Sequence, residues 1–396
     1  MTKIQLKNSK RSTNYLLIVG IVFIAINLRP ALASVGPLVE DIRSTTGLSN
    51  TLLGLLTTLP LIAFGIVSTL TPLFTKRFGI GGTLLGAMIL LTFGILLRYL
   101  PWIPTLYVGT FFLGIAIALG NVLLPSITKR NFSENSGIMT SLYSSFMAFG
   151  AAIAAGLSVP LADTYNLGWR GSLVVWGILS CIAIFIWMPQ VGTLVKTSSN
   201  RSFRASMKKM GKSTLAWKVA LFMGLQSMVF YIILAWLPVI LQSRGYTAAF
   251  AGWMLSLSQA TGIIGSIIIP FVAGKQKDQR GIVAVLILFE LISITGLLFP
   301  QFGLIALWIS ILGVVLGGTF GLALLFLVLR SHDTEEATEL SGMAQSVGYI
   351  VAATGPMLFG GIFDLTRNWD YALLFLFLIA ALKLYMGLGA GKAAKV

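Results

Sequence analysis

Long apolar segments recur along the whole chain, and they constrain its fold more than any other feature. Twelve segments of about 20 residues can be counted, and each is long enough to cross a lipid bilayer as a helix. The chain is 56% apolar and only 10% charged, which leaves little polar surface for a water-soluble protein. The sequence therefore predicts an all-α membrane protein with twelve transmembrane helices.

The distribution of basic residues predicts the orientation of these helices. Of the 28 Lys and Arg residues, 22 fall in the N-terminus, the even-numbered loops and the C-terminus. Because basic loops stay in the cytoplasm, both termini are expected there. The odd-numbered loops hold Arg43, Arg98, Arg170, Arg244 and Arg367. The net charge of +16 lies in short loops between apolar segments, so nucleic acid is not an expected partner.

Two halves of the chain repeat each other. The stretch "GLSNTLLGLLTTLPLIAFGIVSTLTPLF" (47–74) aligns without gaps with "GYTAAFAGWMLSLSQATGIIGSIIIPFV" (245–272), half a chain further on. We expect a six-helix bundle over 1–190, a basic cytoplasmic linker over 191–214 and a second six-helix bundle over 215–396. Two parallel six-helix pseudo-repeats are typical of the major facilitator architecture, whose substrate lies near the middle of the membrane between the halves.

One basic residue lies deep inside the first predicted helix. Arg29 occurs in "IAINLRPALASVGPL" (24–38), and a charge held in hydrocarbon usually has a function. In the expected architecture it is the only formal charge that faces the central cavity. Its guanidinium suits small planar oxyanions or nitro groups, whereas an organic cation would be repelled. The alternative is a structural role, in which Arg29 binds carbonyl groups freed by Pro30 or reaches the membrane surface.

Amide and aromatic side chains in other predicted helices are further candidates for contact with a substrate. Amides also join helices and aromatics also pack, so each residue has a structural alternative. The candidates are Asn27, Asn121, Gln226, Gln259 and Gln345, with the aromatic residues Tyr143, Phe230, Tyr231 and Tyr349. Glu290 is the single acidic residue inside a predicted span, the ninth. It is a candidate proton carrier, with a structural bond at the periphery as the alternative.

The sequence offers nothing for metal, cofactor or enzyme chemistry. With one cysteine, Cys181, and one histidine, His332, a Cys or His metal cluster is excluded. The glycines of "GIGGTLLGA" (79–87) follow no predicted strand and open a membrane helix, so they do not form a phosphate-binding loop. We expect no cofactor, no metal and no enzymatic activity.

Several motifs resemble a known family. They are "NLRPALASVGPL" (27–38), "GNVLLPSITKRNF" (120–132), "AWLPVILQ" (235–242) and "SGMAQSVGYIVAATGP" (341–356). Together they resemble the cyanate/nitroimidazole transporter family of bacterial major facilitators, and the likeness covers nearly the whole chain. The resemblance implies alternating access and small anionic or nitro-aromatic substrates. The arginine of the family's first helix matches Arg29.

Two other functions stay open at this point. One is efflux of hydrophobic drugs that carry no anionic group, which would make Arg29 structural. The other is a membrane sensor that does not transport, although no predicted loop is long enough to fold a signalling domain. We expect a monomer in the lipid bilayer that binds a small-molecule substrate, with protons as a candidate coupling ion. The sequence does not decide the direction of transport.

Overall fold

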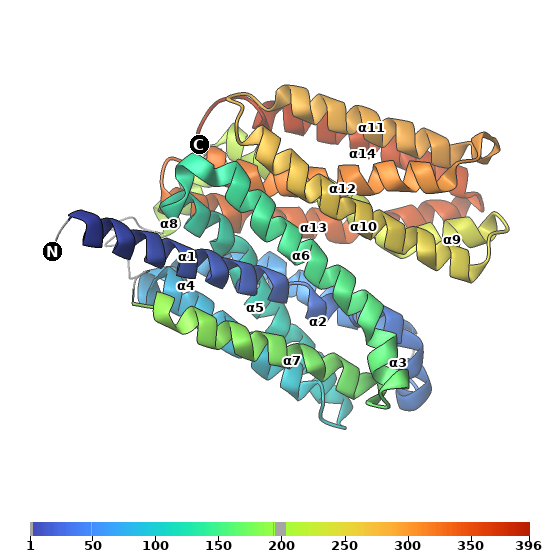
Figure 1. The fold of residues 1–396 in the computed structure, drawn as a ribbon. Coiled ribbons are helices and arrows are strands. Elements are labelled where there is room, and N and C mark those ends of the chain that lie inside the picture. Colours follow the sequence, from blue (N-terminus) through green and yellow to red (C-terminus); the bar gives the residue numbers. More distant parts are fainter. Residues whose placement is uncertain (1–2, 49, 193, 195–202) are drawn as a thin grey trace. The chain divides into compact units, whose positions relative to one another are not determined.

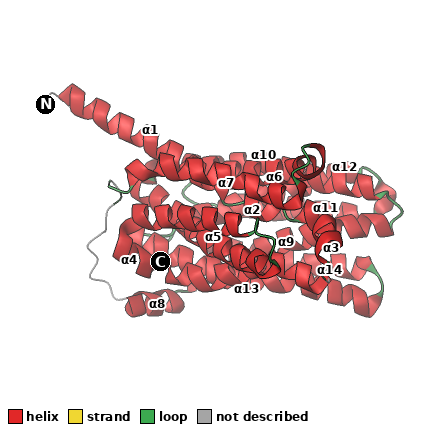
Figure 2. Cartoon of the chain, turned by 90° about the horizontal axis from the view of Figure 1, so that it is seen from below, coloured by secondary structure: helices red, strands yellow, loops and turns green. Residues whose placement is uncertain are grey.

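A computed structural model of the chain describes residues 3–48, 50–192, 194 and 203–396, in which all the longer elements are α-helices (Figure 1 and Figure 2). Within the predicted linker, 191–214, residues 193 and 195–202 lie outside the described residues. The helices are α1 (Lys3–Asn27), α2 (Pro30–Ala33), α3 (Val39–Thr46), α4 (Asn50–Leu97), α5 (Ile103–Asn131), α6 (Ser136–Val159), α7 (Gly168–Trp187), α8 (Phe203–Lys212), α9 (Thr214–Ser243), α10 (Ala248–Ala273), α11 (Arg280–Leu298), α12 (Ile305–Leu329), α13 (Thr334–Thr366) and α14 (Trp369–Ala390).

Within the described residues, 11 helical segments are long and apolar enough to cross a membrane, one fewer than the twelve predicted. The difference lies in α4, whose 48 residues contain both the second and the third predicted span. A straight helix of that length would extend about 72 Å, more than twice the thickness of a bilayer core. Gly79 interrupts it with φ 72° and ψ 172°, a conformation that suits glycine. The turn is so short that the two spans join without a loop.

The packing of the chain divides it into two compact units. Unit 1 comprises Met1–Leu124 and Phe149–Asn200, and unit 2 comprises Pro125–Ala148 and Arg201–Val396. Helices α5 and α6 therefore each contribute to both units. This division follows packing, whereas the expected domains follow the sequence repeat, so the boundaries of those domains stay a prediction.

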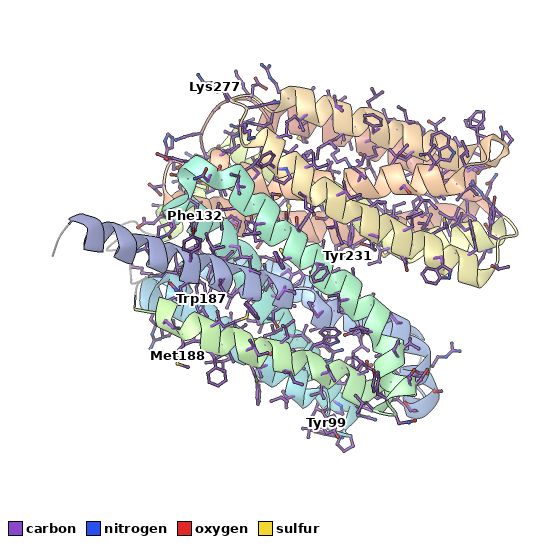
Figure 3. All side chains as sticks on the ribbon, in the orientation of Figure 1. Tyr99, Phe132, Trp187, Met188, Tyr231 and Lys277 are labelled. Carbon is purple, nitrogen blue, oxygen red and sulfur yellow. The ribbon has the colours of Figure 1, made fainter. Side chains whose placement is uncertain are left out.

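In unit 1, helix α7 packs against α1 and α4. The hydroxyl groups of Thr92 and Ser180 lie 2.7 Å apart, and Trp187 Nε1 donates to the carbonyl oxygen of Gly81 at 3.0 Å (Figure 3). Helices α4 and α5 meet at Gly94 and Gly109, where an added Cβ on Gly94 would lie 2.7 Å from the Gly109 carbonyl oxygen. Small residues of this kind let membrane helices approach closely.

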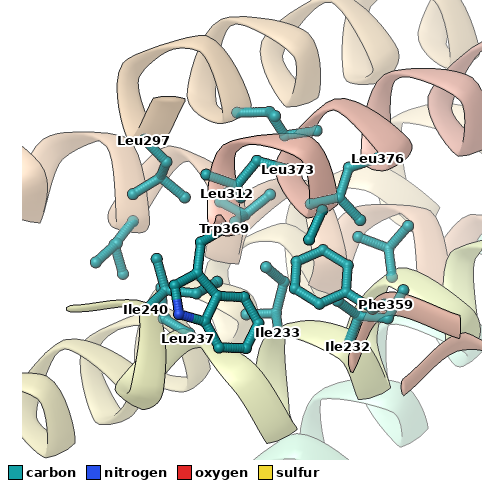
Figure 4. Close-up of a cluster of buried hydrophobic side chains, with 14 of the residues drawn as sticks. Ile232, Ile233, Leu237, Ile240, Leu297, Leu312, Phe359, Trp369, Leu373 and Leu376 are labelled. Carbon is teal, nitrogen blue, oxygen red and sulfur yellow. The ribbon is translucent and has the colours of Figure 1, made fainter. Parts of the chain in front are cut away.

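In unit 2, helix α9 packs against α13 and α14, and α10 packs against α12. Glycine again allows the closest approach, because a Cβ on Gly265 would overlap the carbonyl oxygen of Val314. At one end of the unit a cluster of buried apolar side chains surrounds Trp369, which lies beside Phe359 (Figure 4). The Trp369 ring also stacks on the ring of Phe363. This packing holds α9, α13 and α14 in a fixed register.

Candidate functional site

The first membrane span is broken at Arg29. Helix α1 ends at Asn27, and Pro30 opens the short helix α2 within the same candidate span, Tyr15–Leu38. Proline lacks an N–H group, and its ring clashes with the carbonyl four residues earlier, so a helix cannot continue through it undisturbed. Arg29 is half-buried at this break, with φ −119° and ψ −35°. The predicted anion-binding residue therefore lies at a defined interruption of the helix.

Helix α5 packs directly against the break. An added Cβ on Gly120 would lie 2.6 Å from Leu28 Cδ2, so α5 can approach only because this position is glycine. Asn121, the next residue, is buried. The contact between the two segments is made by Leu28 and Gly120. Arg29 follows Leu28 in the chain and Asn121 follows Gly120, so both predicted contact residues adjoin this contact in unit 1.

A second guanidinium reaches the break. The sequence analysis placed Arg98 in the loop between the third and fourth spans; the residue does lie in the turn between α4 and α5, but its side chain is only 1% exposed. It follows the last residue of α4, and its Nη1 donates to the carbonyl oxygen of Ala31 at 2.8 Å. Its Nε and Nη2 have no hydrogen-bond partner among the described residues. The position directly after a long apolar run is the signal that could have identified a side chain folded back into the membrane span.

Asn27 joins two helices. Its Nδ2 donates to the carbonyl oxygen of Phe23 at 2.7 Å and to that of Leu179, on α7, at 3.3 Å. These bonds occupy the donor side of the amide and connect α1 to α7. The structural alternative considered for Asn27 thus has contacts that support it, while its contact with substrate stays a prediction.

In unit 2, two predicted amides lie beside the crossing of α9 and α13. A Cβ on Gly224 would lie 3.0 Å from Gly348 Cα, so the two backbones meet at these glycines. Gln226 and Gln345 are each within one turn of this crossing. Gln226 Nε2 donates to Ser227 Oγ at 2.6 Å. Gln345 is 1% exposed, and neither its amide nitrogen nor its amide oxygen has a partner within the described parts of the chain.

Helix α13 carries further buried polar side chains one turn before and one turn after Gln345. Ser341, Gln345 and Tyr349 follow one another at intervals of four residues and all are buried, so they share one face of the helix. Ser341 Oγ also lacks a partner in the described region. The sequence analysis identified Gln345 and Tyr349 but not Ser341, although the spacing of four residues would have linked all three.

The remaining predicted contacts lie elsewhere in unit 2. Phe230 and Tyr231 are neighbours on α9, with half-buried rings whose centroids are 5.4 Å apart in an edge-on arrangement. Tyr143 lies on α6, which is bound to α10 where Ser141 Oγ donates to the carbonyl oxygen of Ile267 at 2.6 Å. Gln259 lies half-buried on that same helix α10. Tyr143 and Gln259 therefore belong to the α6–α10 pair, and the other unit 2 candidates belong to the α9–α13 pair.

Glu290 has a direct partner inside the membrane region. The nitrogen Nζ of Lys383 lies 2.7 Å from Glu290 Oε1 and 2.6 Å from Oε2, and both side chains are 0% exposed. The 22 basic residues that the sequence analysis assigned to the loops and termini include Lys383, and for this residue the assignment is wrong, because it lies within α14. The pair joins α11 to α14, in agreement with the structural alternative for Glu290. A role in coupling stays a prediction.

The site residues offer amide, hydroxyl, aromatic and guanidinium groups. No group of three or more His, Cys, Asp or Glu residues that could hold a metal ion occurs within the described ranges. The chemistry available near the break of α1 is the binding of an electron-rich group by N–H donors.

Comparison with known proteins gives the family. The sequence profile of the Major Facilitator Superfamily matches residues 16–356. The uncharacterized transporter YycB of Bacillus subtilis (strain 168) is 41% identical over 386 residues, which cover 97% of this chain and 96% of that protein. The 2-nitroimidazole transporter of Escherichia coli (strain K12) is 39% identical over 380 residues and 96% of each chain. The cyanate transport protein CynX of the same strain is 25% identical over 350 residues, or 88% and 90% of the two chains.

Solved structures show the same fold. The proton:xylose symporter XylE superposes with a TM-score of 0.77 over 95% of each chain, at 15% sequence identity. FucP in its outward conformation superposes with a TM-score of 0.72 over 94% of this chain and 98% of that one, at 16% identity. These likenesses confirm the predicted fold class. The chain therefore belongs to the Major Facilitator Superfamily, as a membrane transporter similar to the 2-nitroimidazole and cyanate transporters.

Proposed function

We propose that the protein is a secondary active transporter that moves a small anionic or nitro-bearing solute by alternating access. It would work as a monomer in the bacterial inner membrane, with both termini in the cytoplasm. One observation carries this proposal: Arg29 lies at the break of α1 inside a membrane span, and the guanidinium of Arg98 binds the Ala31 carbonyl just beyond that break. Two cations at a break in a membrane helix favour an electron-rich ligand over a cationic one.

The geometry of Arg98 suits such a ligand. Nη1 is taken by the Ala31 carbonyl, which leaves Nε and Nη2 on one edge of the guanidinium. Two parallel N–H groups on one edge can bind two oxygen atoms of a planar oxyanion or of a nitro group. Arg29 adds a second positive charge at the same break.

The relatives support the same solute class. One of them is named for 2-nitroimidazole and another for cyanate. Both compounds are small and present electron-rich nitrogen or oxygen atoms to hydrogen-bond donors. We infer that the solute of this transporter shares that feature.

Amide contacts from unit 2 are part of the proposal. Gln345 is the best supported of them, because both ends of its buried amide lack a partner among the described residues. A buried amide without partners is costly, and a polar ligand or water would remove that cost. Gln226, Tyr349 and the rings of Phe230 and Tyr231 stay proposed contacts with less direct support.

The rival function is efflux of hydrophobic compounds without an anionic group. One observation favours it: the bond from Arg98 to the Ala31 carbonyl shows that the broken helix needs donors for its own backbone. In that case the arginines at the break would maintain the fold and would not select the solute.

A ligand-dependent thermal shift on the purified chain separates the two functions. The variants are Arg29→Ala and, as a matched control, Arg43→Ala, which removes an exposed arginine of α3. The ligands are 2-nitroimidazole, cyanate, a small carboxylate and an organic cation. At 100 times its Kd, a true ligand stabilises the fold by about 2.7 kcal/mol, so the response must depend on dose.

We expect an anion or the nitro compound to stabilise the wild type and Arg43→Ala, while folded Arg29→Ala loses that response. Equal responses of all three proteins, or stabilisation by the cation alone, would reject the anion function.

A further inference from the structure

A shallow groove opens on unit 2 between the ends of α9, α11 and α14. Its volume is 590 Å³, and its lining residues are Lys218, Arg280, Gly281, Ala284, Tyr385, Leu388 and Gly389. It contains none of the predicted solute contacts. Arg280 is the first residue of α11 and Gly389 is near the end of α14, so the groove lies where candidate membrane spans begin and end.

The groove is basic at its rim. Lys218 makes no hydrogen bond or ion pair with the described residues, and its Nζ lies 6.0 Å from the centre of the Tyr385 ring. A Cβ on Gly389 would overlap Lys218 Cδ, so the lysine stem lies across this glycine. Arg280 is bound to Asp278, with an N–O distance of 2.6 Å, and this bond holds the pKa of the Asp278 carboxyl below its usual range. With one carboxylate against two cations, the rim keeps a net positive charge.

Below the rim the groove is apolar. Ala284 and Leu388 line it, and Tyr385 is 65% exposed beside them. Trp217, next to Lys218, is 42% exposed and donates from Nε1 to the Gly211 carbonyl. Exposed tyrosine and tryptophan at the ends of membrane helices are typical of the interface between lipid headgroups and hydrocarbon.

The segment just before α9 is also basic. Helix α8, "FRASMKKMGK", places the exposed lysines Lys208, Lys209 and Lys212 close to the start of α9. Basic helices of this kind bind the anionic surface of a membrane. The groove therefore combines a cationic rim, aromatic residues of the interface and an apolar floor at one end of unit 2.

We propose that this groove binds one anionic phospholipid, with the phosphate at Lys218 and Arg280 and an acyl chain along Ala284, Tyr385 and Leu388. Basic grooves between membrane helices on the cytoplasmic side are suited to such lipids, because the headgroup meets the cations while the chain covers apolar side chains. The site is separate from the solute site, and it does not depend on which solute is transported.

Thermal unfolding of the purified full chain in detergent tests the site. The wild type is titrated with phosphatidylglycerol, with phosphatidylcholine of the same acyl chains, and with inorganic phosphate. Two variants remove the charge, Lys218→Gln and Arg280→Gln, and Ala284→Trp fills the groove without a change of charge. The matched control is Lys275→Gln, an exposed lysine beyond the end of α10 that does not line the groove.

We expect only phosphatidylglycerol to raise the Tm of the wild type and of Lys275→Gln. Each charge-removing variant should need about fivefold more of this lipid, because a single Lys or Arg near an anionic lipid headgroup strengthens binding by about that factor. Ala284→Trp should lose the response while its Tm without lipid stays close to that of the wild type. The proposal fails if phosphatidylcholine or phosphate acts as well as phosphatidylglycerol. It fails equally if all groove variants respond like Lys275→Gln.

Discussion

At the scale of single residues, the proposed function gives the guanidinium of Arg98 two tasks at the break of α1. Its Nη1 satisfies the Ala31 carbonyl, which lies in a candidate membrane span where water is scarce. Its Nε and Nη2 have no partner among the described residues, and the proposal assigns them to the solute. The two tasks need different numbers of donors. One N–H group is enough to bind the carbonyl oxygen, whereas a ligand with two oxygen atoms needs two parallel N–H groups in one plane.

Two substitutions of Arg98 separate these tasks. Arg98→Ala should lower the free energy of unfolding by about 1.5–3 kcal/mol, since it removes a hydrogen bond from a charged donor. Arg98→Lys should recover part of this stability and yet lose the response to the anionic or nitro ligand, because an ammonium group is not a planar fork. Thermal unfolding with and without ligand measures both effects. A ligand response in Arg98→Lys equal to that of the wild type would show that the fork is not used.

The sequence was sufficient to find Arg29, but it did not show that the side chain of Arg98 is buried. A charge in the middle of an apolar segment is visible in the sequence, whereas a charge at its edge can point outward or fold back along the helix. The backbone position is the same in both cases, and only packing against α2 decides between them. Gln345 raises the same problem, because periodicity predicts its helix face but does not show whether its amide has partners.

At the scale of helices, the ion pair between Glu290 and Lys383 joins α11 to α14, which lie side by side in unit 2 (Figure 1). Both side chains are fully buried, so their desolvation is offset only by their mutual contact. Loss of one partner would leave an uncompensated charge in an apolar environment. Replacing both residues by apolar ones would leave no buried charge at this position.

We expect Lys383→Met to lower the free energy of unfolding by about 3–5 kcal/mol, because it leaves Glu290 buried and unpaired. The double variant Glu290→Leu with Lys383→Met should regain most of this loss and should keep its transport activity. Unfolding measurements and an uptake assay in liposomes, with and without a pH gradient, provide the readouts. If the stable double variant lost its response to the pH gradient, Glu290 would be a coupling residue and not a structural one.

The helices themselves were largely predictable, since apolar segments of bilayer length have few alternatives in a membrane. The join within α4 was not, because a single glycine with φ 72° replaces the polar loop that usually separates two spans. The ion pair that joins α11 to α14 could not be predicted from the sequence either. Lys383 lies near the end of the last apolar segment, and its charge suggested a position in the tail.

At the scale of the whole molecule, the asymmetry of basic residues predicts which ends of the helices face the cytoplasm. The turn after α10 carries Lys275 and Lys277, whereas the turn between α13 and α14 carries the single basic residue Arg367. Basic loops are retained on the cytoplasmic side, so the first turn should face the cytoplasm and the second the outside. The groove proposed for anionic lipid lies at the same end of unit 2 as the first turn, because Arg280 follows that turn directly.

Site-directed labelling tests this orientation. In a Cys181→Ala background, which removes the single native cysteine, Lys275→Cys and Asn368→Cys each place one thiol at an exposed position. With a maleimide that cannot cross membranes, Asn368→Cys should react in intact cells. Lys275→Cys should react only after the membrane is permeabilised, since the basic turn stays on the cytoplasmic side. The opposite pattern would invert the topology and would place the lipid groove in the outer leaflet, where the charge bias would no longer explain it.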